Sequence, residues 1–396
     1  MIIKYVKKIY FQRIHLKLFN IILTVLIPVI KPNKNCKKFL ILFAGQYYNG
    51  NLKSLYEEFR KLRNFNNKPL EIYWVVKHRK EIKKFQKEGV KTLWFYGIGN
   101  IPKFLKANIW INDRGKGDIP IPKLKNSFWV QAWHGIPFKG FAGCEKTRES
   151  FNEFDLHPVS SQWLKDYYVQ KIGVKEDKVV VTGYPRIDRL LKPYYNRNQI
   201  IKEIGLNQNQ PILLYAPTWE HESGKVKPLF PFQGEIKFLN KLILFLERNN
   251  LQMVIRLHPN YRYRNEEVID LIKKTDRIIQ NSVRENWDTG KFLYISDILI
   301  TDWSSIANDF IVLNRPIIFL DVPFELFKYG YALRPEERAG KIVKDEEEFF
   351  KSILQSLSNP KEYENKRNKI IKKIHFQIDV ENSKRTIKTI EKFYAR

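Results

Sequence analysis

The sequence predicts an α/β protein with two domains, each built around a mainly parallel β-sheet. At 396 residues the chain is longer than one ordinary hydrophobic core serves, and it fits two domains of comparable size. Short apolar runs alternate with amphipathic stretches, which is the pattern of strands joined by crossover helices. The alternation stops in a polar stretch at 195–210 and then starts again. We therefore expect the two domains to meet near residues 190–210.

The expected strands follow one another along both halves of the chain. In the first half they are the apolar runs at 39–44, 71–76, 92–96, 109–112 and 128–132, with helical patterns at 52–62 and 79–87 between several of them. Later strands are expected at 179–181, 212–216, 253–257, 277–280, 298–301 and 316–320, with a helix at 236–248 and closing helices in 344–396. We assign residues 34–195 to the first domain, 196–375 to the second and 376–396 to a closing helix. Ligands of such folds bind at the carboxyl ends of the strands, in the cleft between the domains.

Residues 1–33 are expected to form a separate segment. Apolar side chains recur at helical spacing from Ile3 to Leu18, and five basic side chains share the remaining surface, which predicts a basic amphipathic helix. The apolar run at 18–30 includes an asparagine and a proline and is shorter than the roughly 20 residues that a spanning helix requires. A signal peptide is disfavoured because the charges are spread and no small-residue cleavage site follows. We expect this segment to lie on an anionic membrane surface, with docking against the protein's own body as the alternative.

The composition limits the classes of function. Hydrophobic residues are 43% and aromatic residues 14%, which excludes a disordered chain. Cys36 and Cys144 are too few for a disulfide framework or a zinc cluster, as is typical of a reducing compartment. The net charge of +28 favours polyanionic partners, although many lysines lie in helix-like stretches that read as solvated faces. We expect no nucleic-acid partner, because the sequence has no finger, RRM or helix-turn-helix signature. The absence of GxGxxG and GxxxxGK[ST] disfavours nicotinamide and P-loop enzymes.

Three histidines stand at or soon after the ends of expected strands, where the chemistry of α/β proteins is usually located: His134, His221 and His258. His134 lies in WHGIPFK at 133–139, where a glycine and a proline restrict the backbone and Lys139 follows within reach of an anion. Imidazole titrates near neutrality, so His134 can accept a proton from a hydroxyl group. The alternative is a histidine that caps a turn by hydrogen bonding.

Two further strand ends carry groups suited to phosphate. Alternation along the strand puts Arg256 and His258 on the same side, where a diphosphate would satisfy both cations. The alternative is an arginine paired with a carboxylate and a histidine bonded to the backbone. In SDILITDWSS at 296–305, a buried strand ends in hydroxyl and carboxylate groups, and Ser304 or Ser305 is placed to cap the following helix. The N-terminus of that helix can bind phosphate, and plain capping is the alternative.

Two rigid turns add one polar group each. Arg186 follows the turn in GYPR at 183–186, and Thr218 follows the turn in YAPT at 215–218. Each side chain suits a phosphate or a nucleotide, although neither turn is specific alone.

The ordered motifs WHGIPFK, GYPRID, YAPTW, RLHPN and SDILITDWSS resemble those of the CDP-glycerol glycerophosphotransferase family of teichoic acid synthesis. The resemblance covers roughly residues 38–345 and implies a GT-B-like fold, which consists of two Rossmann-type domains around a central cleft. It also implies peripheral attachment to the cytoplasmic face of the cell membrane. Members of this family move glycerol phosphate from CDP-glycerol to a lipid-linked acceptor and release CMP.

The resemblance implies roles for the residues in the motifs. His134 would be the base or an equivalent catalytic group, and His258, also a catalytic candidate, would hold the donor diphosphate. Donor-binding roles would fall to Arg186, Thr218, Arg256, Asp302, Ser304 and Ser305, and Lys139 would contact the acceptor or a phosphate. Ile136, Glu220 and Trp303 depart from the family pattern, and an acid near the donor could alter which activated alcohol is accepted. CDP-ribitol is therefore kept beside CDP-glycerol as a donor.

The length of the chain resembles that of the compact primases of this family. A primase would add the first glycerol phosphate to an undecaprenyl-diphosphate-linked disaccharide. The alternatives are a teichoic acid or capsule polymerase that uses CDP-glycerol or CDP-ribitol, and a GT-B glycosyltransferase that uses a nucleotide sugar. A nucleic-acid-binding protein and a structural membrane-surface protein are further rivals. No motif demands a metal, and metal dependence is left open.

Overall fold

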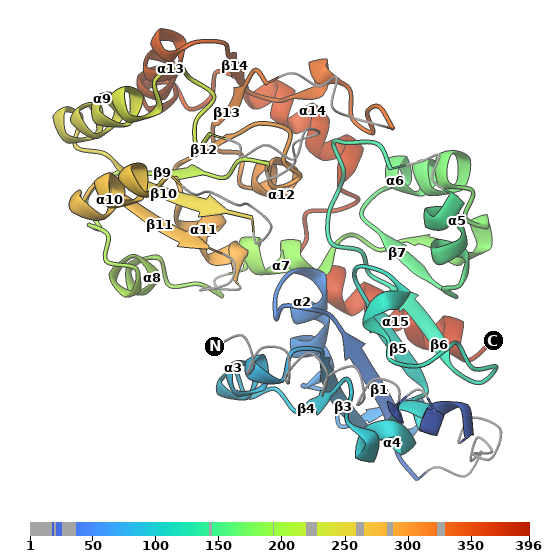
Figure 1. The fold of residues 1–396 in the computed structure, drawn as a ribbon. Helices are drawn as coiled ribbons and strands as arrows, with labels where there is room; N and C mark the ends of the chain where they lie inside the picture. Colours follow the sequence, from blue (N-terminus) through green and yellow to red (C-terminus); the bar gives the residue numbers. More distant parts are fainter. Residues whose placement is uncertain are drawn as a thin grey trace.

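Two mainly parallel β-sheets form the two lobes of the molecule (Figure 1). The computed structural model describes residues 18–19, 21–25, 37–141, 145–192, 194–218, 228–258, 265–282, 288–322 and 329–396. The first sheet lies between residues 39 and 131, and the second lies between residues 212 and 343. The polar stretch at 195–210 runs between them, and the domain boundaries remain a prediction.

The first sheet has the strand order β2-β3-β1-β5-β6, with β4 paired to β3. All pairs are parallel except β2 with β3, which form a hairpin through Asn66 and Asn67, both with positive φ. Strand β1 is FLILFA and is buried throughout, as expected of a central parallel strand. The strands are β1 (Phe39–Ala44), β2 (Asn64–Phe65), β3 (Lys68–Val76), β4 (Thr92–Trp94), β5 (Ile109–Asn112) and β6 (Phe128–Gln131). The helices between them are α2 (Gly50–Phe59), α3 (Ile82–Lys87) and α4 (Ile101–Lys106).

The second sheet has the order β11-β10-β9-β12-β13-β14 and is parallel throughout. Its strands are β9 (Ile212–Tyr215), β10 (Gln252–Leu257), β11 (Ile278–Ser282), β12 (Ile298–Thr301), β13 (Ile317–Leu320) and β14 (Lys341–Val343). The helices along it are α9 (Glu235–Arg248), α10 (Glu266–Lys274), α11 (Thr289–Ile295), α12 (Ile306–Phe310) and α13 (Glu346–Ser358). The apolar faces of α9 and α13 pack in one core cluster with one face of this sheet.

A third, smaller group of elements lies between the two sheets in the sequence. Strands β7 (His157–Val159) and β8 (Val179–Val181) pair in parallel. The helices of this group are α5 (Glu145–Asn152), α6 (Gln162–Tyr167), α7 (Pro185–Leu191) and α8 (Arg197–Glu203), and α14 (Glu364–Ile374) packs against α6.

The last helix, α15 (Asn382–Tyr394), returns to the first lobe, where it lies in red beside the strands of the first sheet (Figure 1). Ile387 and Ile390 are buried in the core cluster of that sheet. The Tyr394 ring stands edge-on to Phe39, with 4.9 Å between the ring centroids. At its other end, α15 is held by Asp188 of α7, whose carboxylate accepts four hydrogen bonds from the first two residues of the helix. The core of the first lobe therefore includes side chains from α15.

The structure confirms the expected strands at 39–44, 109–112, 179–181 and 298–301, and it finds the others within a few residues. The sequence analysis missed β2, β7 and β14, because each has only two or three residues and β7 contains Pro158. It also missed helix α8 inside the polar stretch at 195–210. Asn196 caps α8 by accepting from the backbone N–H of Gln199, and two buried isoleucines anchor it.

Most of the expected amphipathic helix lies outside the described residues. Residues 18–19 and 21–25 are helical, and Phe19 and Leu23 are buried against the first domain. Leu18, Ile21 and Val25 are exposed on the same segment. In the part of the chain that the structure describes, no helix combines the length and the apolar character needed to cross a membrane.

Candidate active site

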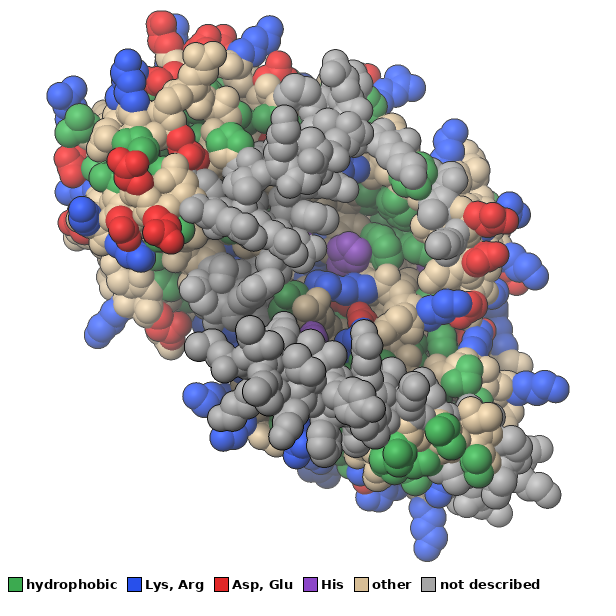
Figure 2. All heavy atoms as spheres, in the orientation of Figure 1, with side chains coloured by type: hydrophobic (Ala, Val, Ile, Leu, Met, Phe, Trp, Pro, Cys, Tyr) green, Lys and Arg blue, Asp and Glu red, His purple; other side chains and the backbone are tan. Residues whose placement is uncertain are grey.

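A cavity of about 670 Å³ opens where the carboxyl ends of both sheets face each other. Figure 2 shows histidine and basic side chains gathered in the hollow between the lobes. The nine site residues expected from the sequence come together here. Eight of them line the cavity: His134, Lys139, Arg186, Thr218, Arg256, His258, Ser304 and Ser305. The ninth, Asp302, holds Thr218 in place. Both His221 and Glu220 lie outside the described residues.

His134 sits on a sharp turn directly after β6. Trp133 adopts a left-handed conformation with φ of 45°, and the side-chain amide of Asn51 holds the turn by donating to the carbonyl oxygens of Ala132 and Trp133, both at 2.9 Å. The Nδ1 atom of His134 lies 2.9 Å from the backbone carbonyl oxygen of Asp113. A carbonyl only accepts, so Nδ1 carries the proton and Nε2 keeps its lone pair.

The protein around His134 favours its neutral form. The side chain is exposed to the open cavity, and desolvation by the protein atoms around it lowers its pKa to about 4. The hydrogen bond to Asp113 works against this shift, and the positive charges of Arg114 and Arg186 add to it. At neutral pH the imidazole is therefore uncharged and able to accept a proton.

The turn that carries His134 also contacts the second lobe. A Cβ atom on Gly135 would lie 3.2 Å from the Ser305 Oγ, so only glycine allows this approach without displacement. Asn308 of α12 donates to the carbonyl oxygen of Ile136 at 2.8 Å. Lys139 pairs with Tyr331 in an antiparallel bridge. The expected catalytic turn is thus held by both halves of the chain.

Arg186 has protein partners on both sides of the cavity. Its Nη1 donates to the carbonyl oxygen of His134 at 2.6 Å, and its Nη2 forms an ion pair with Asp309 of α12, also at 2.6 Å. Burial raises the pKa of Asp309 to about 6, against the lowering effect of Arg186. The sequence indicated a phosphate contact for this arginine; in the structure it also connects the His134 turn to α12.

The ends of β9 and β12 lie side by side on the opposite wall. The Asp302 carboxylate accepts from the backbone N–H of Thr218 at 2.9 Å and from its hydroxyl at 2.6 Å. The expected side-chain cap of α12 is not formed. Ser305 occupies the N-cap position with φ of −60° and ψ of −10°, a helical conformation instead of the extended one that a capping serine adopts. Ser304 and Ser305 face the cavity with their hydroxyl groups uncommitted to that cap.

Arg256 is buried at the end of β10. Its guanidinium donates to Asn281 Oδ1 at 2.9 Å and to Thr289 Oγ1 at 3.0 Å, and it stacks on the Phe292 ring at 4.4 Å. Both of these hydrogen-bond acceptors are neutral side chains. His258, two residues on, is exposed and lines the same cavity.

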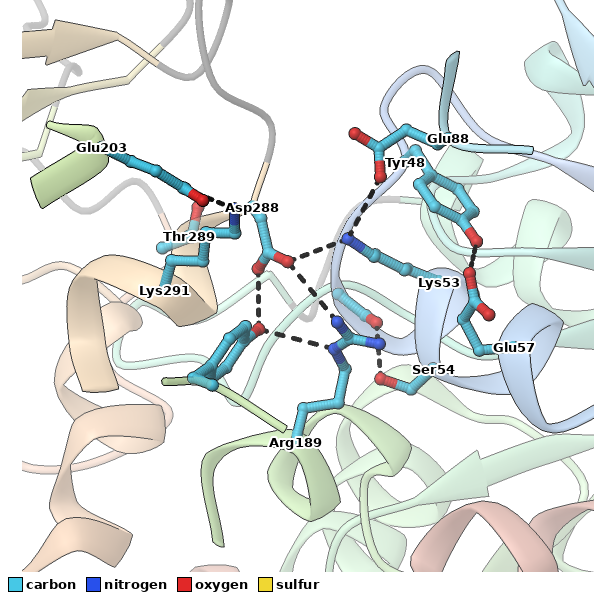
Figure 3. A network of polar contacts seen from close by, with 12 residues as sticks. Tyr48, Lys53, Ser54, Glu57, Glu88, Arg189, Glu203, Asp288, Thr289 and Lys291 are labelled. Carbon is cyan, nitrogen blue, oxygen red and sulfur yellow. Dashed lines mark hydrogen bonds and ion pairs between the residues drawn. The ribbon is translucent and has the colours of Figure 1, made fainter. Parts of the chain in front are cut away.

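A buried ionic network, which the sequence analysis missed, lines one side of the cavity (Figure 3). Asp288 accepts from Lys53 Nζ and from the Tyr195 hydroxyl, each at 2.9 Å, and it pairs with Arg189 at 3.6 Å. Burial raises the pKa of Asp288, but Lys53 and Arg189 outweigh this effect and lower it to about 2. No sequence signal pointed to these residues, because they come from four separate segments and Lys53 reads as a solvated helix residue.

The sequence analysis also missed Asp113, which directly follows β5 and lines the cavity beside His134. Its position after a predicted strand is the same signal that identified His134. Among the described residues, no group of three histidine, cysteine, aspartate or glutamate side chains is arranged to hold a metal ion.

Residues 24–392 match the family model described as CDP-glycerol:poly(glycerophosphate) glycerophosphotransferase. The chain belongs to this family. This glycerophosphotransferase is 26% identical to the teichoic acid glycerol-phosphate transferase of Staphylococcus aureus, over 91% of its own length and 94% of the relative's. It is also 26% identical to a teichoic acid poly(glycerol phosphate) polymerase of Bacillus spizizenii, over 82% of its own length and 84% of the relative's.

The fold of this glycerophosphotransferase is similar to that of the wall teichoic acid polymerase TagF. The two superpose with a TM-score of 0.77 at 20% identity, over 99% of this chain and 97% of the TagF chain. The likeness confirms the expected α/β fold with parallel sheets. The family match confirms the expected enzyme class, a CDP-glycerol glycerophosphotransferase of teichoic acid synthesis.

Proposed function

We propose that this glycerophosphotransferase adds glycerol phosphate from CDP-glycerol to an undecaprenyl-diphosphate-linked disaccharide in wall teichoic acid synthesis. The main support for the proposal is that a base and a set of phosphate-binding side chains line opposite walls of one cavity. His134, with its Nε2 lone pair, comes from the first half of the chain, while Thr218, Arg256 and the serines after β12 come from the second. A base on one wall and phosphate-binding groups on the other suit transfer between an alcohol and an activated phosphate.

In the proposed step, His134 Nε2 takes the proton of the acceptor hydroxyl while that oxygen attacks the phosphorus that bears glycerol. The bond between this phosphorus and the oxygen shared with CMP breaks, and CMP leaves with the electron pair. The proton then passes from His134 to water. Arg256 and His258 balance the negative charge of the diphosphate, and the hydroxyl groups of Ser304 and Ser305 donate to its oxygens.

We assign the chain to the first addition, as a primase. The match with the S. aureus glycerol-phosphate transferase supports a compact enzyme that transfers glycerol phosphate, because it spans nearly the full length of both chains. A polymerase is the second candidate, because the B. spizizenii polymerase is matched over 84% of its length. Length alone therefore does not separate one addition from many.

We further propose that the protein works at the cytoplasmic face of the membrane as a peripheral protein. An exposed apolar strip on a helical segment beside the first lobe supports this location. It consists of Leu18, Ile21 and Val25. The net charge of +28 would add attraction to anionic headgroups.

The test is incubation of the purified protein with CDP-glycerol and the lipid-linked disaccharide, with the products resolved by mass. One added glycerol phosphate supports a primase, and a ladder of additions supports the polymerase. Parallel reactions with CDP-ribitol and with a nucleotide sugar test the other donors. Turnover of the nucleotide sugar alone would reject the proposal in favour of a glycosyltransferase.

The role of His134 is tested with His134→Ala, with His78→Ala as the matched control. His78 is exposed and lies outside the cavity. We expect His134→Ala to lose at least a hundredfold in kcat while it still binds CDP-glycerol in a calorimetric titration, and His78→Ala to match the unchanged protein. Near-normal turnover of His134→Ala would remove the base assignment.

A further inference from the structure

Asp113 differs from the other aspartates around the cavity, because no other described residue forms an ion pair or a hydrogen bond with its carboxyl group. Asp288 is paired with Lys53, Asp302 with Thr218 and Asp309 with Arg186. Residue Asp113 is only 5% exposed, and its Oδ1 atom is buried without a hydrogen bond. Leaving a buried carboxyl group without a partner is unfavourable, so such a group in a cleft indicates a ligand-binding role.

The backbone of Asp113 is already part of the site. Its carbonyl oxygen accepts from His134 Nδ1, which fixes the imidazole against the end of β5. The Asp113 side chain therefore lies on the same wall as His134. Thr218 and Arg256 lie on the opposite wall, which the second sheet provides. A substrate bound between Asp113 and His134 is thus the one that faces the donor, namely the acceptor.

The charges around Asp113 select the chemistry of its ligand. Burial raises the pKa of this carboxyl group to about 7, Arg114 and Arg186 lower it, and Asp118 raises it. Of these neighbours, Arg114 donates to Gln46 and Arg186 is paired with Asp309. Near neutral pH the carboxyl group can both accept and donate, and a hydroxyl group complements either form. A second phosphate would be repelled by the ionised form, so the ligand is an alcohol.

We propose that Asp113 binds the acceptor through a hydroxyl group next to the attacking one, and so places the attacking oxygen at His134 Nε2. The acceptor is then a polyol or a sugar with neighbouring hydroxyl groups, not a simple alcohol. This inference rests on the proposed function, because it assumes that His134 activates the acceptor.

The test compares Asp113→Ala and Asp113→Asn with the control Asp177→Asn, in transfer from CDP-glycerol to the disaccharide acceptor. Asp177 is an exposed aspartate that does not line the cavity. We expect Asp113→Ala to raise the acceptor KM by about tenfold or more, because a site built for a hydroxyl group loses its partner. The KM of CDP-glycerol should stay within about twofold. Asp113→Asn keeps an accepting oxygen and should recover part of the loss.

Acceptor analogues that each lack one hydroxyl group identify the contact. With the unchanged protein, one monodeoxy acceptor should have its KM raised by the same factor as Asp113→Ala raises the KM of the full acceptor. With Asp113→Ala, the KM of that analogue should be no higher than the KM of the full acceptor. Equal acceptor KM values for Asp113→Ala and the unchanged protein would overturn the inference. So would a result in which every analogue raises the KM of Asp113→Ala by as much as it raises the KM of the unchanged protein.

The two proposals fail in different ways. If the unchanged protein and Asp177→Asn transfer glycerol phosphate while the Asp113 variants behave identically to them, only the role of Asp113 is wrong. If the unchanged protein transfers to none of these acceptors, the proposed function is wrong. Should Asp113→Ala not fold, Asp113→Asn carries the same comparison, with calorimetric CDP-glycerol binding as the check of its folded state.

Discussion

Removal of the buried ion pair between Lys53 and Asp288 will measure how strongly the two halves of the chain are coupled. Lys53 belongs to α2 in the first half, and Asp288 stands immediately before α11 in the second. Lys53→Met and Asp288→Asn each remove one charge with little change in volume, and the double variant removes both. Together with the unchanged protein, they form a double-mutant cycle.

The magnitude follows from the geometry of the pair. The Lys53 Nζ and Asp288 Oδ2 atoms are 2.9 Å apart, and the two side chains are 10% and 11% exposed. At an effective dielectric constant of about 20, their direct attraction is about 6 kcal/mol, which desolvation partly offsets. The fall of the Asp288 pKa from 3.8 to about 2 corresponds to a net ~2 kcal/mol, in which Lys53 and Arg189 outweigh burial. We therefore expect a coupling free energy of about 2 to 4 kcal/mol.

The pH dependence has a definite sign. Because the pKa of Asp288 is lower in the folded protein, the stabilisation is fully present above about pH 4, near the pKa of the unfolded carboxyl group. It is lost as the pH falls from there towards 2. The cycle measured at pH 7 should therefore give the full coupling.

Urea unfolding followed by tryptophan fluorescence gives the four free energies of unfolding. The same cycle on the exposed pair Lys38 and Glu71 is the control, and it should give less than about 1 kcal/mol. A coupling for Lys53 and Asp288 no larger than this control value would refute the reasoning.

Three further predictions concern the site and the last helix. Because the pKa of His134 in the free protein is lowered to about 4, its basic form persists to acid pH, and the acid limb of the kcat/KM profile should lie near pH 4 instead of 6.5. A limb at 6.5 would contradict this environment. Gly135→Ala brings a Cβ atom to 3.2 Å from Ser305 Oγ and should reduce kcat by about tenfold, with little change in Tm. Gly99→Ala is the control, because Gly99 has open space around it, and it should change neither kcat nor Tm. Asp188→Ala removes the acceptor of four hydrogen bonds from Asn382 and Ser383, and it should lower the free energy of unfolding by about 3 kcal/mol. Asp188→Asn should recover part of this free energy. An unchanged urea midpoint would argue against the anchoring role of Asp188.

Much of the fold could be predicted because a central parallel strand is a continuous apolar run. The segments 39–44 and 298–301 are buried throughout, and their limits follow directly from hydrophobicity. The two- and three-residue strands could not be found in this way, since their pairing is decided by the neighbouring chain. Helix α8 was hidden because only Ile200 and Ile201 anchor it within a polar stretch.

The candidate site was predicted where chemistry depends on a strand end. His134, Thr218 and His258 each follow an apolar run, and parallel sheets bring such ends to one edge. The network around Asp288 depends instead on tertiary packing. Lys53 lies on a helix whose charged side chains look solvated in the sequence, and its partner is 235 residues away.

The return of α15 to the first lobe links the folding of that lobe to the order of synthesis. Ile387 and Ile390 are supplied by α15, so a nascent chain that has finished residues 39–131 still presents apolar side chains that α15 would cover. These side chains are covered only after the whole second lobe and residues 382–394 have emerged from the ribosome. A fragment that contains the first lobe alone should therefore self-associate, and it should become monomeric when a peptide of the α15 sequence is supplied in trans.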